Sequence, residues 1–481
     1  MSADVIARGL VAQARQSAAT DLALTRLRGA MRQARDGAVF AQPPLIAPPA
    51  WSASTAYAKG QMVAANGNCY VAVTAGTSAS SGAGPAARTV NGGGAIADGG
   101  VLWTYFGPVR ITVNDAAAPT LTQSATDPAF GITITYKAYP QSFALYGAYG
   151  SSFDGANRLI PNGFGAKPGQ PGPAAGRRIE FCSDGANVMV SLAGSNAASF
   201  CRVAVDQYDG RGLRLVTPGS LLSASPFIRL GWATAEKRRY VVFLSTANYD
   251  VFAGVQVDNG ATVWAPVVAD PLRAVLIADS IVAGSGFGPF LAGNDIATRL
   301  ALGLGIADIW GFAAGGTGEL NPGAAGLSTF VQRLPEAMAL KPDLWLILGS
   351  CNDRSANGYT GAALSAQVTA TMQAIRSGGA TAPIIRGGAW PIADSADIAA
   401  CEAAIKAGYD AFAATDPYPH GYVPVSAATP PIITRGYNNG GGVLMSNVNQ
   451  YLGGDGHPTD WGIAHAANRL VEGIAGAPGT A

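Results

Sequence analysis

Four short motifs in the C-terminal half of the chain carry residue types that could perform acyl-transfer chemistry. In chain order they are Asp279-Ser280, the glycine-rich residues 314–318, residues 349–353 with Asn352 among them, and Asp455-Gly456-His457. They supply a hydroxyl nucleophile, a backbone N–H group at a tight turn, a side-chain amide donor, and a carboxylate beside an imidazole. These groups together are what acyl transfer requires.

Each group meets a separate need of that reaction. A serine hydroxyl is a poor nucleophile until an imidazole at about 2.6–3.2 Å accepts its proton. The imidazole needs a carboxylate on its other nitrogen to fix its tautomer. The developing oxyanion needs donors already in place, each contributing about 3–4 kcal/mol to lowering the barrier. The reaction requires no metal and no cofactor.

The supply of histidines narrows the choice of base. The chain contains only His420, His457 and His465. His420 lies in a turn-rich loop, and His465 lies inside the predicted last helix. His457 stands next to an acidic residue just before that helix, so we predict it as the base. The alternative is a loop histidine without a role.

The elements that would position these residues follow from the hydrophobic pattern of residues 271–481. Apolar, β-branched runs predict strands near 273–278, 306–312, 343–348, 383–388 and 421–425; helical periodicity predicts helices near 294–303, 328–339, 361–377, 397–414 and 459–474. The alternation predicts a doubly wound parallel sheet, with its crevice at the carboxyl ends of the strands. Ser280, Gly316 and Asn352 each follow a predicted strand.

Over roughly residues 271–475 the four motifs resemble those of the SGNH (GDSL-like) hydrolases, a family of esterases and lipases. The resemblance implies a flavodoxin-like α/β domain with Ser280 as the nucleophile and His457 as the base. Asp455 would orient His457. The oxyanion hole would consist of the N–H groups of Ser280 and Gly316 and the side chain of Asn352.

The chain differs from the usual family pattern at three places. Ala278 stands where the family has glycine before Asp-Ser, the third motif has one additional residue, and Asp455 lies two rather than three residues before His457. Neighbouring glycines allow a bend that would bring Asp455 back to the imidazole. The departures at Ala278 and Asp455 favour an alternative, a receptor-binding protein whose SGNH-like domain holds a glycan without cleaving it.

Composition limits the remaining functions. A chain of 481 residues predicts several domains, and a formal net charge of +1 gives no indication of a nucleic-acid partner or an acidic membrane surface. Five scattered cysteines show neither a metal-binding nor a disulfide-rich spacing. The first 16 residues lack the apolar core of a secretion signal, and no stretch has the roughly 18 apolar residues of a membrane span.

The residues ahead of 271 predict four segments. Residues 1–40 have helical periodicity and would serve as an anchor or oligomerisation helix, with a solvated tail as the alternative. Residues 41–50 form a proline-rich linker. Residues 108–270 alternate in the manner of a β-sandwich, and Ser183-Asp184-Gly185 predicts a hairpin turn within it.

Residues 51–107 resemble the small chitin-binding-type carbohydrate modules, which open and close on a tryptophan. Trp51, Tyr70 and Trp103 would then stack on sugar rings. The alternative is that these three aromatic residues make the core of a small spacer domain. The opening residues 6–10 resemble the start of many bacteriophage structural proteins.

These expectations combine into a serine esterase that deacylates a carbohydrate polymer, with acetyl as the favoured acyl group. The segment order is typical of a phage tail fibre or tailspike acting outside the cell on a host surface glycan. Such a protein would be a homo-oligomer, with a trimer suspected, and would join a tail or virion partner through its N-terminal helix. It would bind no nucleic acid and insert into no membrane. A cellular, exported carbohydrate esterase is the second alternative.

Overall fold

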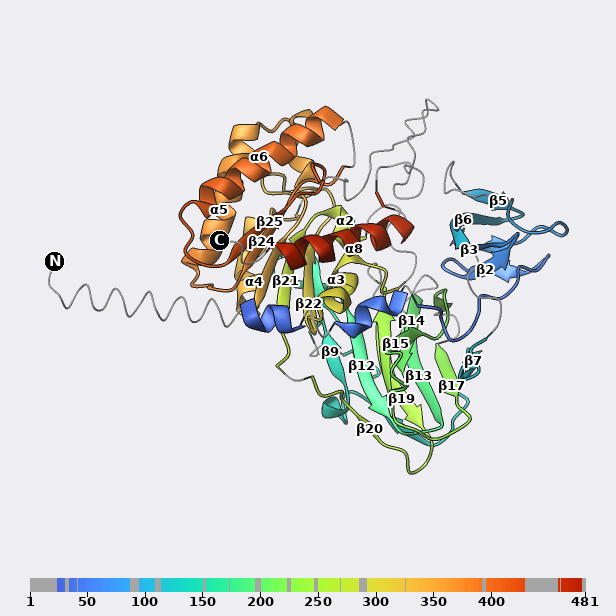
Figure 1. The fold of residues 1–481 in the computed structure, drawn as a ribbon. Coiled ribbons are helices and arrows are strands. Elements are labelled where there is room, and N and C mark those ends of the chain that lie inside the picture. The colour runs from blue at the N-terminus through green and yellow to red at the C-terminus, as the bar shows by residue number, and fades with distance from the viewer. Residues whose placement is uncertain are drawn as a thin grey trace, which may run out of the picture.

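The computed structural model describes residues 24–30, 34–40, 42–86, 95–108, 114–149, 153–172, 174–194, 200–222, 226–245, 250–268, 270–284, 292–324, 326–391, 395–428, 457–458 and 460–477. Figure 1 shows an α/β unit built from the C-terminal residues, a β-sandwich packed below it, and a small β module set to one side. No helix in the described residues is both long enough and apolar enough to span a membrane.

The α/β unit contains a five-stranded parallel sheet in the order β22-β21-β23-β24-β25. Its strands are β21 (Arg273–Ala278), β22 (Asp308–Ala313), β23 (Leu344–Ile347), β24 (Ile384–Gly387) and β25 (His420–Val423). The strand order changes direction at β21, because β22 lies on one side of it and β23 on the other. Open α/β sheets bind their ligands at such a switch point, at the carboxyl ends of the strands.

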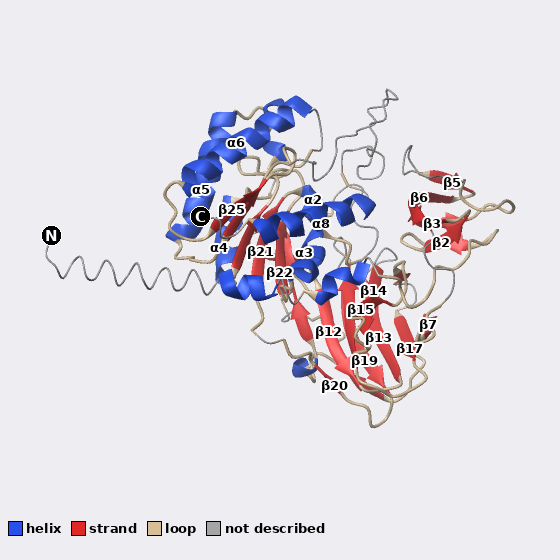
Figure 2. Cartoon of the chain, viewed as in Figure 1, coloured by secondary structure: helices blue, strands red, loops and turns tan. Residues whose placement is uncertain are grey.

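Helices cover both faces of this sheet. They are α2 (Ser280–Ala283), α3 (Ile296–Leu304), α4 (Leu334–Ala339), α5 (Gly361–Ser377), α6 (Ser395–Ala413) and α8 (Asp460–Gly476), with 3-10 turns η3 (Val331–Arg333), η4 (Cys351–Asp353) and η5 (Ser355–Asn357). Figure 2 shows α3 and α8 together on one face and α5 beside α6 on the other. Strands β22, β23 and β24 are buried at every residue and β21 at all but its first, as expected for a sheet covered on both faces, whereas the edge strand β25 is partly exposed.

All five predicted strands and the predicted helices of the α/β unit are present within a few residues of their expected positions, whereas the short helix α2 was not predicted. The helix predicted over 328–339 is divided into the 3-10 turn η3 and the short helix α4. Pro335 explains the division, because proline has no N–H to donate and is tolerated only in the first turn of a helix.

Two antiparallel sheets form the β-sandwich. One contains β15 (Leu213–Leu215), β14 (Phe200–Asp206), β18 (Arg238–Leu244), β12 (Arg178–Ser183), β20 (Val263–Trp264), β16 (Leu221–Leu222) and β9 (Ala144–Tyr146). The other contains β7 (Thr120–Ser124), β17 (Phe227–Gly231), β13 (Asn187–Gly194), β19 (Asp250–Val257) and β8 (Ile132–Ile134). Apolar side chains from both sheets make one shared core. A turn, η2 (Pro140–Ser142), precedes β9.

The predicted hairpin at Ser183-Asp184-Gly185 is wrong. The turn joins β12 to β13, but these strands belong to different sheets: β12 pairs with β18, and β13 pairs with β17 and β19. Both strands present apolar residues to the shared core, so the chain crosses from one sheet to the other. Asp258 fixes the crossing by accepting hydrogen bonds from the N–H and the amide of Asn187, at 2.7 and 3.0 Å.

A hairpin from the sandwich region reaches the α/β unit. It consists of β10 (Gly163–Lys167) and β11 (Gln170–Gly172). Phe164 of β10 is buried in the core of the α/β unit and stacks on Phe312 of β22, with 4.8 Å between ring centroids. Glu336 of α4 accepts a 2.7 Å hydrogen bond from the Tyr149 hydroxyl and a 3.0 Å bond from the Gly169 N–H. The sandwich and the α/β unit are therefore joined by buried and polar contacts.

The small module is a four-stranded antiparallel sheet with an added two-stranded pair. Its strands are β2 (Met62–Ala65), β3 (Asn68–Thr74), β6 (Val101–Pro108) and β5 (Ile96–Asp98), and the pair is β1 (Ala56–Tyr57) and β4 (Gly76–Thr77). Asn66-Gly67 links β2 to β3 with both residues at positive φ, as two-residue hairpin turns require.

The described part of the N-terminal segment packs against its own chain. Residues 24–30 are helical and are followed by the 3-10 turn η1 (Arg35–Phe40). Leu27 is buried in the core of the α/β unit, and Arg26 donates to Asp270 and Asp343. The apolar side chains of Leu24, Leu27 and Val39 are thus buried against the same chain, and the predicted oligomer or virion partner stays a prediction. Residues 1–23 lie outside the described residues.

Candidate active site

Ser280 occupies the strand-to-helix turn at the carboxyl end of β21, the second strand of the parallel sheet. Strand β21 ends at Ala278, Asp279 is extended, and Ser280 is the first residue of the four-residue helix α2. The Asp279 carboxylate accepts from the Ile281 N–H at 3.1 Å, which caps this helix. Ser280 is 4% exposed, so its hydroxyl lies in a largely enclosed position.

His457 meets Ser280 across 177 residues of sequence. The Ser280 Oγ and His457 Nε2 atoms are 2.9 Å apart, and His457 is half-buried just ahead of α8. When Nδ1 carries the ring proton, Nε2 is the acceptor and can take the hydroxyl proton. The distance lies within the range for a serine and its general base. Asp455 lies outside the described residues, so its role in orienting His457 stays a prediction.

Gly316 follows β22, the strand next to β21 in the sheet. Its φ is +72°, a left-handed conformation that favours glycine, and it is exposed to solvent. Among the described residues, none accepts a hydrogen bond from the N–H of Ser280 or of Gly316. Within the described residues, neither of the two predicted backbone donors of the oxyanion hole is therefore used by the fold.

Asn352 follows β23, the neighbour of β21 on its other side. Its Nδ2 atom donates to the Thr317 carbonyl oxygen at 2.9 Å, which ties it to the turn that carries Gly316. An amide has two N–H donors, so this bond leaves one for another acceptor. Asp353 strengthens the same connection: its carboxylate accepts from the N–H groups of Glu319, Leu320 and Asn321 at 2.6–3.1 Å.

Asp279 links the nucleophile turn to the Asn352 loop. Its Oδ2 atom accepts from the Ser350 N–H at 3.2 Å and from the Cys351 thiol at 3.4 Å. Burial raises the pKa of Asp279 to about 6, opposed by these hydrogen bonds and by the charge of His457. Gly349 has a φ of +103°, and a Cβ there would lie 2.3 Å from Asp279 Oδ2. Consecutive positive φ values at Gly349 and Ser350 accommodate the additional residue of this motif.

A set of buried charged side chains that the sequence did not predict lies beneath the site. Arg333, Arg386, Glu319 and Asp353 are each at most 2% exposed. Arg386 donates to the Ile347 and Gly387 carbonyl oxygens at the ends of β23 and β24. Of the four, only Asp353 lies in one of the motifs, so only its position could have been singled out from the sequence. Glu319 and the two arginines lie in segments whose sequence pattern does not distinguish a buried charge from a solvated one.

The three aromatic residues predicted to bind sugar lie in the small module, outside the α/β unit. Tyr70 and Trp103 have 0% exposure and belong to the module's apolar core. The indole N–H groups of Trp51 and Trp103 both donate to Asp98, at 2.7 and 3.0 Å. Burial leaves Tyr70 and Trp103 no face for stacking on a sugar, which favours the spacer-core alternative for both. Trp51 is partly exposed, and its role stays a prediction.

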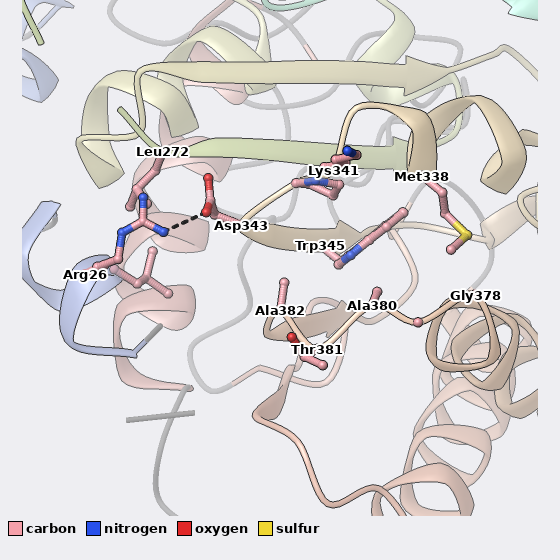
Figure 3. Close-up of a pocket in the computed structure, with 13 residues that line it drawn as sticks. Arg26, Leu272, Met338, Lys341, Asp343, Trp345, Gly378, Ala380, Thr381 and Ala382 are labelled. Atoms are coloured by element: carbon pink, nitrogen blue, oxygen red, sulfur yellow. Dashed lines mark hydrogen bonds and ion pairs between the residues drawn. The ribbon is translucent and has the colours of Figure 1, made fainter. Parts of the chain in front are cut away.

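A pocket of about 400 Å³ lies at the opposite edge of the parallel sheet from Ser280. Figure 3 shows Arg26 donating to Asp343 at one side of it, with Trp345 and Met338 further along the wall. Leu272 and Asp343 immediately precede β21 and β23, so this pocket faces the amino ends of the strands. It contains none of the predicted catalytic residues.

No protein-family model and no curated protein matches the chain. Solved structures do match it. A family two carbohydrate esterase from Cellvibrio japonicus has 13% identity and a TM-score of 0.48, covering 74% of this chain and 97% of that one. A salicylyl-acyltransferase from a tetracycline biosynthetic pathway has 17% identity and a TM-score of 0.49, with the same coverage.

A second family two carbohydrate esterase, from Clostridium thermocellum in complex with cellohexaose, has 16% identity and a TM-score of 0.46 over 69% of this chain and 98% of that one. At such identities and TM-scores, these likenesses assign neither an activity nor a substrate to the chain. The chemistry must therefore be argued from the geometry of Ser280, His457 and the loops around them.

Proposed function

We propose that the chain is a serine esterase in which Ser280 is the nucleophile and His457 the general base. The 2.9 Å separation between Ser280 Oγ and His457 Nε2 carries this proposal. It joins two residues far apart in sequence, at the carboxyl edge of a parallel sheet where α/β folds place their chemistry. Sequence motifs had selected the same two residues independently of the fold.

The reaction would proceed in two steps. In the first, Ser280 Oγ attacks the carbonyl carbon of an ester while its proton passes to His457 Nε2. The oxyanion accepts hydrogen bonds from the Ser280 and Gly316 N–H groups and the Asn352 amide. The C–O bond to the alcohol then breaks, and the alcohol leaves with the proton from His457. In the second step a water molecule gives a proton to His457 and attacks the acyl carbon. The bond from that carbon to Ser280 Oγ then breaks, Ser280 Oγ takes the proton from His457, and the carboxylic acid leaves. Asp455 would orient His457 throughout.

The proposed substrate is an acylated carbohydrate polymer, with acetyl as the acyl group. Its main support is the resemblance of the motifs to SGNH esterases, because the burial of Tyr70 and Trp103 leaves only Trp51 of the carbohydrate-module resemblance in residues 51–107. We also propose a phage tail setting, supported by the resemblance of residues 6–10 to phage structural proteins. Release of acetate from an O-acetylated host polysaccharide tests the first of these. Co-sedimentation of the chain with phage particles tests the second.

Hydrolysis of 4-nitrophenyl acetate tests the reaction class directly. The wild type should turn it over, and Ser280→Ala should reduce kcat by at least about 10⁴-fold, since removal of a triad member has this effect in serine hydrolases. Binding of the host polysaccharide is measured on both proteins. Equal binding with no Ser280-dependent hydrolysis would contradict the esterase and leave the glycan-binding alternative.

A further inference from the structure

Arg333 forms hydrogen bonds to both strands that lead into the two proposed catalytic turns, the Ser280 turn after β21 and the Gly316 turn after β22. It lies at the end of η3, is 0% exposed, and belongs to none of the four motifs. Its Nη1 atom donates to the Ala278 carbonyl oxygen at 2.6 Å and to the Phe312 carbonyl oxygen at 3.0 Å. Ala278 is the last residue of β21, two residues before Ser280, and Phe312 lies near the end of β22, four residues before Gly316.

The guanidinium also holds the loop that follows β22. Its Nη2 atom donates to the Thr317 hydroxyl and to the Ser328 carbonyl oxygen, each at 2.5 Å, and Nε donates to the Ser328 hydroxyl at 3.2 Å. These bonds, with the two from Nη1, use all five N–H donors of the group. Thr317 is the residue next to Gly316, and its carbonyl oxygen accepts from Asn352. One side chain therefore contacts the nucleophile turn, the Gly316 turn and, through Thr317, the Asn352 loop.

Backbone pairing alone holds the carboxyl ends of β21 and β22 together only weakly. The backbone bond that continues the pairing of β21 and β22, from the Ala314 N–H to the Ala278 carbonyl oxygen, is 3.4 Å long. The Arg333 bond to the same oxygen is 2.6 Å long. At the point where strand pairing ends and the catalytic turns begin, the guanidinium provides the shorter connection.

Aromatic rings from two parts of the chain flank the guanidinium. Its carbon lies 5.3 Å from the Phe330 ring centroid and 5.8 Å from the Phe164 ring centroid. Phe330 immediately precedes η3, whereas Phe164 belongs to the β10 hairpin and stacks on Phe312. Burial lowers the pKa of Arg333 to about 10, so the group stays charged at neutral pH, supported by the charges of Asp279 and Glu319.

We infer that Arg333 is a positioning residue, which sets the spacing between the Ser280 turn and the Gly316 turn and is held in place by Phe164 of the β10–β11 hairpin. This inference rests on the proposed esterase function. Lysine cannot replace arginine here, because an ammonium group has three donors and no planar fork, whereas five acceptors surround the position. The hairpin thereby becomes part of the catalytic scaffold.

The test compares Arg333→Lys with Arg238→Lys. Arg238 is likewise buried, at 3% exposure, and donates to the carbonyl oxygens of Thr234 and Glu236, but it lies on β18 of the sandwich and, among the described residues, makes no hydrogen bond to the β10–β11 hairpin or its flanks. Arg333→Lys should lower kcat on 4-nitrophenyl acetate about 10- to 100-fold per folded molecule while KM changes little, because misplacing catalytic groups by about 1 Å costs this much. Arg238→Lys should lower stability and leave kcat within about twofold.

Phe164→Leu provides a second test of the inference, which applies even if Arg333→Lys does not fold. It loosens one wall around the guanidinium and should lower kcat about 3- to 10-fold without a matching change in KM. Wild-type kcat in folded Arg333→Lys, or in Phe164→Leu, would overturn the inference.

Absence of Ser280-dependent turnover in the wild type would instead overturn the proposed function. A crystal structure of Arg333→Lys, or of Phe164→Leu should the lysine variant not fold, then decides the inference. Displacement of the Ser280 and Gly316 turns relative to one another supports it. Unchanged positions, with Ser280 Oγ and His457 Nε2 still 2.9 Å apart, overturn it.

Discussion

Functional residues were predicted from the sequence both at the carboxyl edge of the parallel sheet and in the small module, and the structure places the two sets differently. At the sheet edge, residues chosen for their chemistry lie at the ends of adjacent strands, and Ser280 and His457 are in contact. In the module, Tyr70 and Trp103 were chosen because aromatic faces bind sugars, yet both are fully buried. The four motifs at the sheet edge support one another, whereas a domain of this size needs its large aromatic residues for a core.

The difference also appears in how each region satisfies buried charge. In the module a single carboxylate, Asp98, accepts from two indole N–H groups. Beneath the catalytic turns, Arg333 and Arg386 donate to strand-end carbonyl oxygens, and Asp279 and Asp353 accept from loop N–H groups. Buried charges with this many partners fix the positions of the loops that carry the proposed catalytic residues.

The largest effect we expect is from His457→Gln, which removes the base but keeps a polar side chain of similar reach. It should lower kcat about 10⁴-fold, or roughly 5 kcal/mol, at little cost in stability. His420→Gln is the matched control, since His420 contacts the Tyr409 hydroxyl at 2.9 Å away from the catalytic turns. Comparable losses in both variants would show that the assignment of the base is wrong.

Trp103→Ala tests the module side of the comparison. Trp103 packs edge-on against Tyr57 at 5.0 Å, so truncation should destabilise the module by about 3–5 kcal/mol. Hydrolysis of 4-nitrophenyl acetate should be unchanged. Protease sensitivity of residues 51–107 and initial rates are the measurements. Trp51→Ala serves as the partly exposed counterpart. A raised KM for a polymeric substrate in Trp103→Ala, without loss of stability, would restore the sugar-stacking interpretation.

Asn352→Asp removes the amide donors while keeping the size of the side chain. We expect kcat to fall about 10²-fold, close to 3 kcal/mol, because one oxyanion donor is lost and a carboxylate faces the developing negative charge. KM should change much less. Steady-state kinetics on 4-nitrophenyl acetate measures both. A drop confined to KM would mean that Asn352 binds the substrate rather than its transition state.

A smaller effect should follow from Glu319→Gln. Burial raises the pKa of Glu319 to about 7, opposed by the charge of Arg386, whose Nη2 atom lies 3.7 Å from Oε1. Between pH 4.5 and 7 the folded state therefore binds a proton that the unfolded chain has released. The free energy of unfolding falls as pH rises through that window.

In the Glu319→Gln variant this pH-dependent change in the free energy of unfolding, which amounts to at most about 3 kcal/mol, should be absent. Urea unfolding of both proteins at pH 5 and pH 8 measures it. The difference in free energy of unfolding, variant minus wild type, should be more positive at pH 8. An equal difference at both pH values would contradict the burial argument.

Much of the α/β unit was predictable, and the reason is physical. Strands such as β21 and β23 are continuous apolar runs, and a one-residue error in such a run changes little because both faces are buried. The turn at residues 183–185 failed because its composition indicates a reversal without saying which sheet receives the next strand. Arg333 was missed because three of its five acceptors, on Ala278, Phe312 and Thr317, come from segments brought beside it only by the fold.

The most direct test of the central claim is labelling with a fluorophosphonate, which reacts covalently with activated serine hydroxyls. Digestion and mass spectrometry then identify the modified serine. We predict a single adduct on Ser280, absent from His457→Gln at the same exposure. An unlabelled wild-type protein, or label spread over other serines and unaffected by His457→Gln, would contradict the assignment of Ser280 and His457 as the catalytic pair.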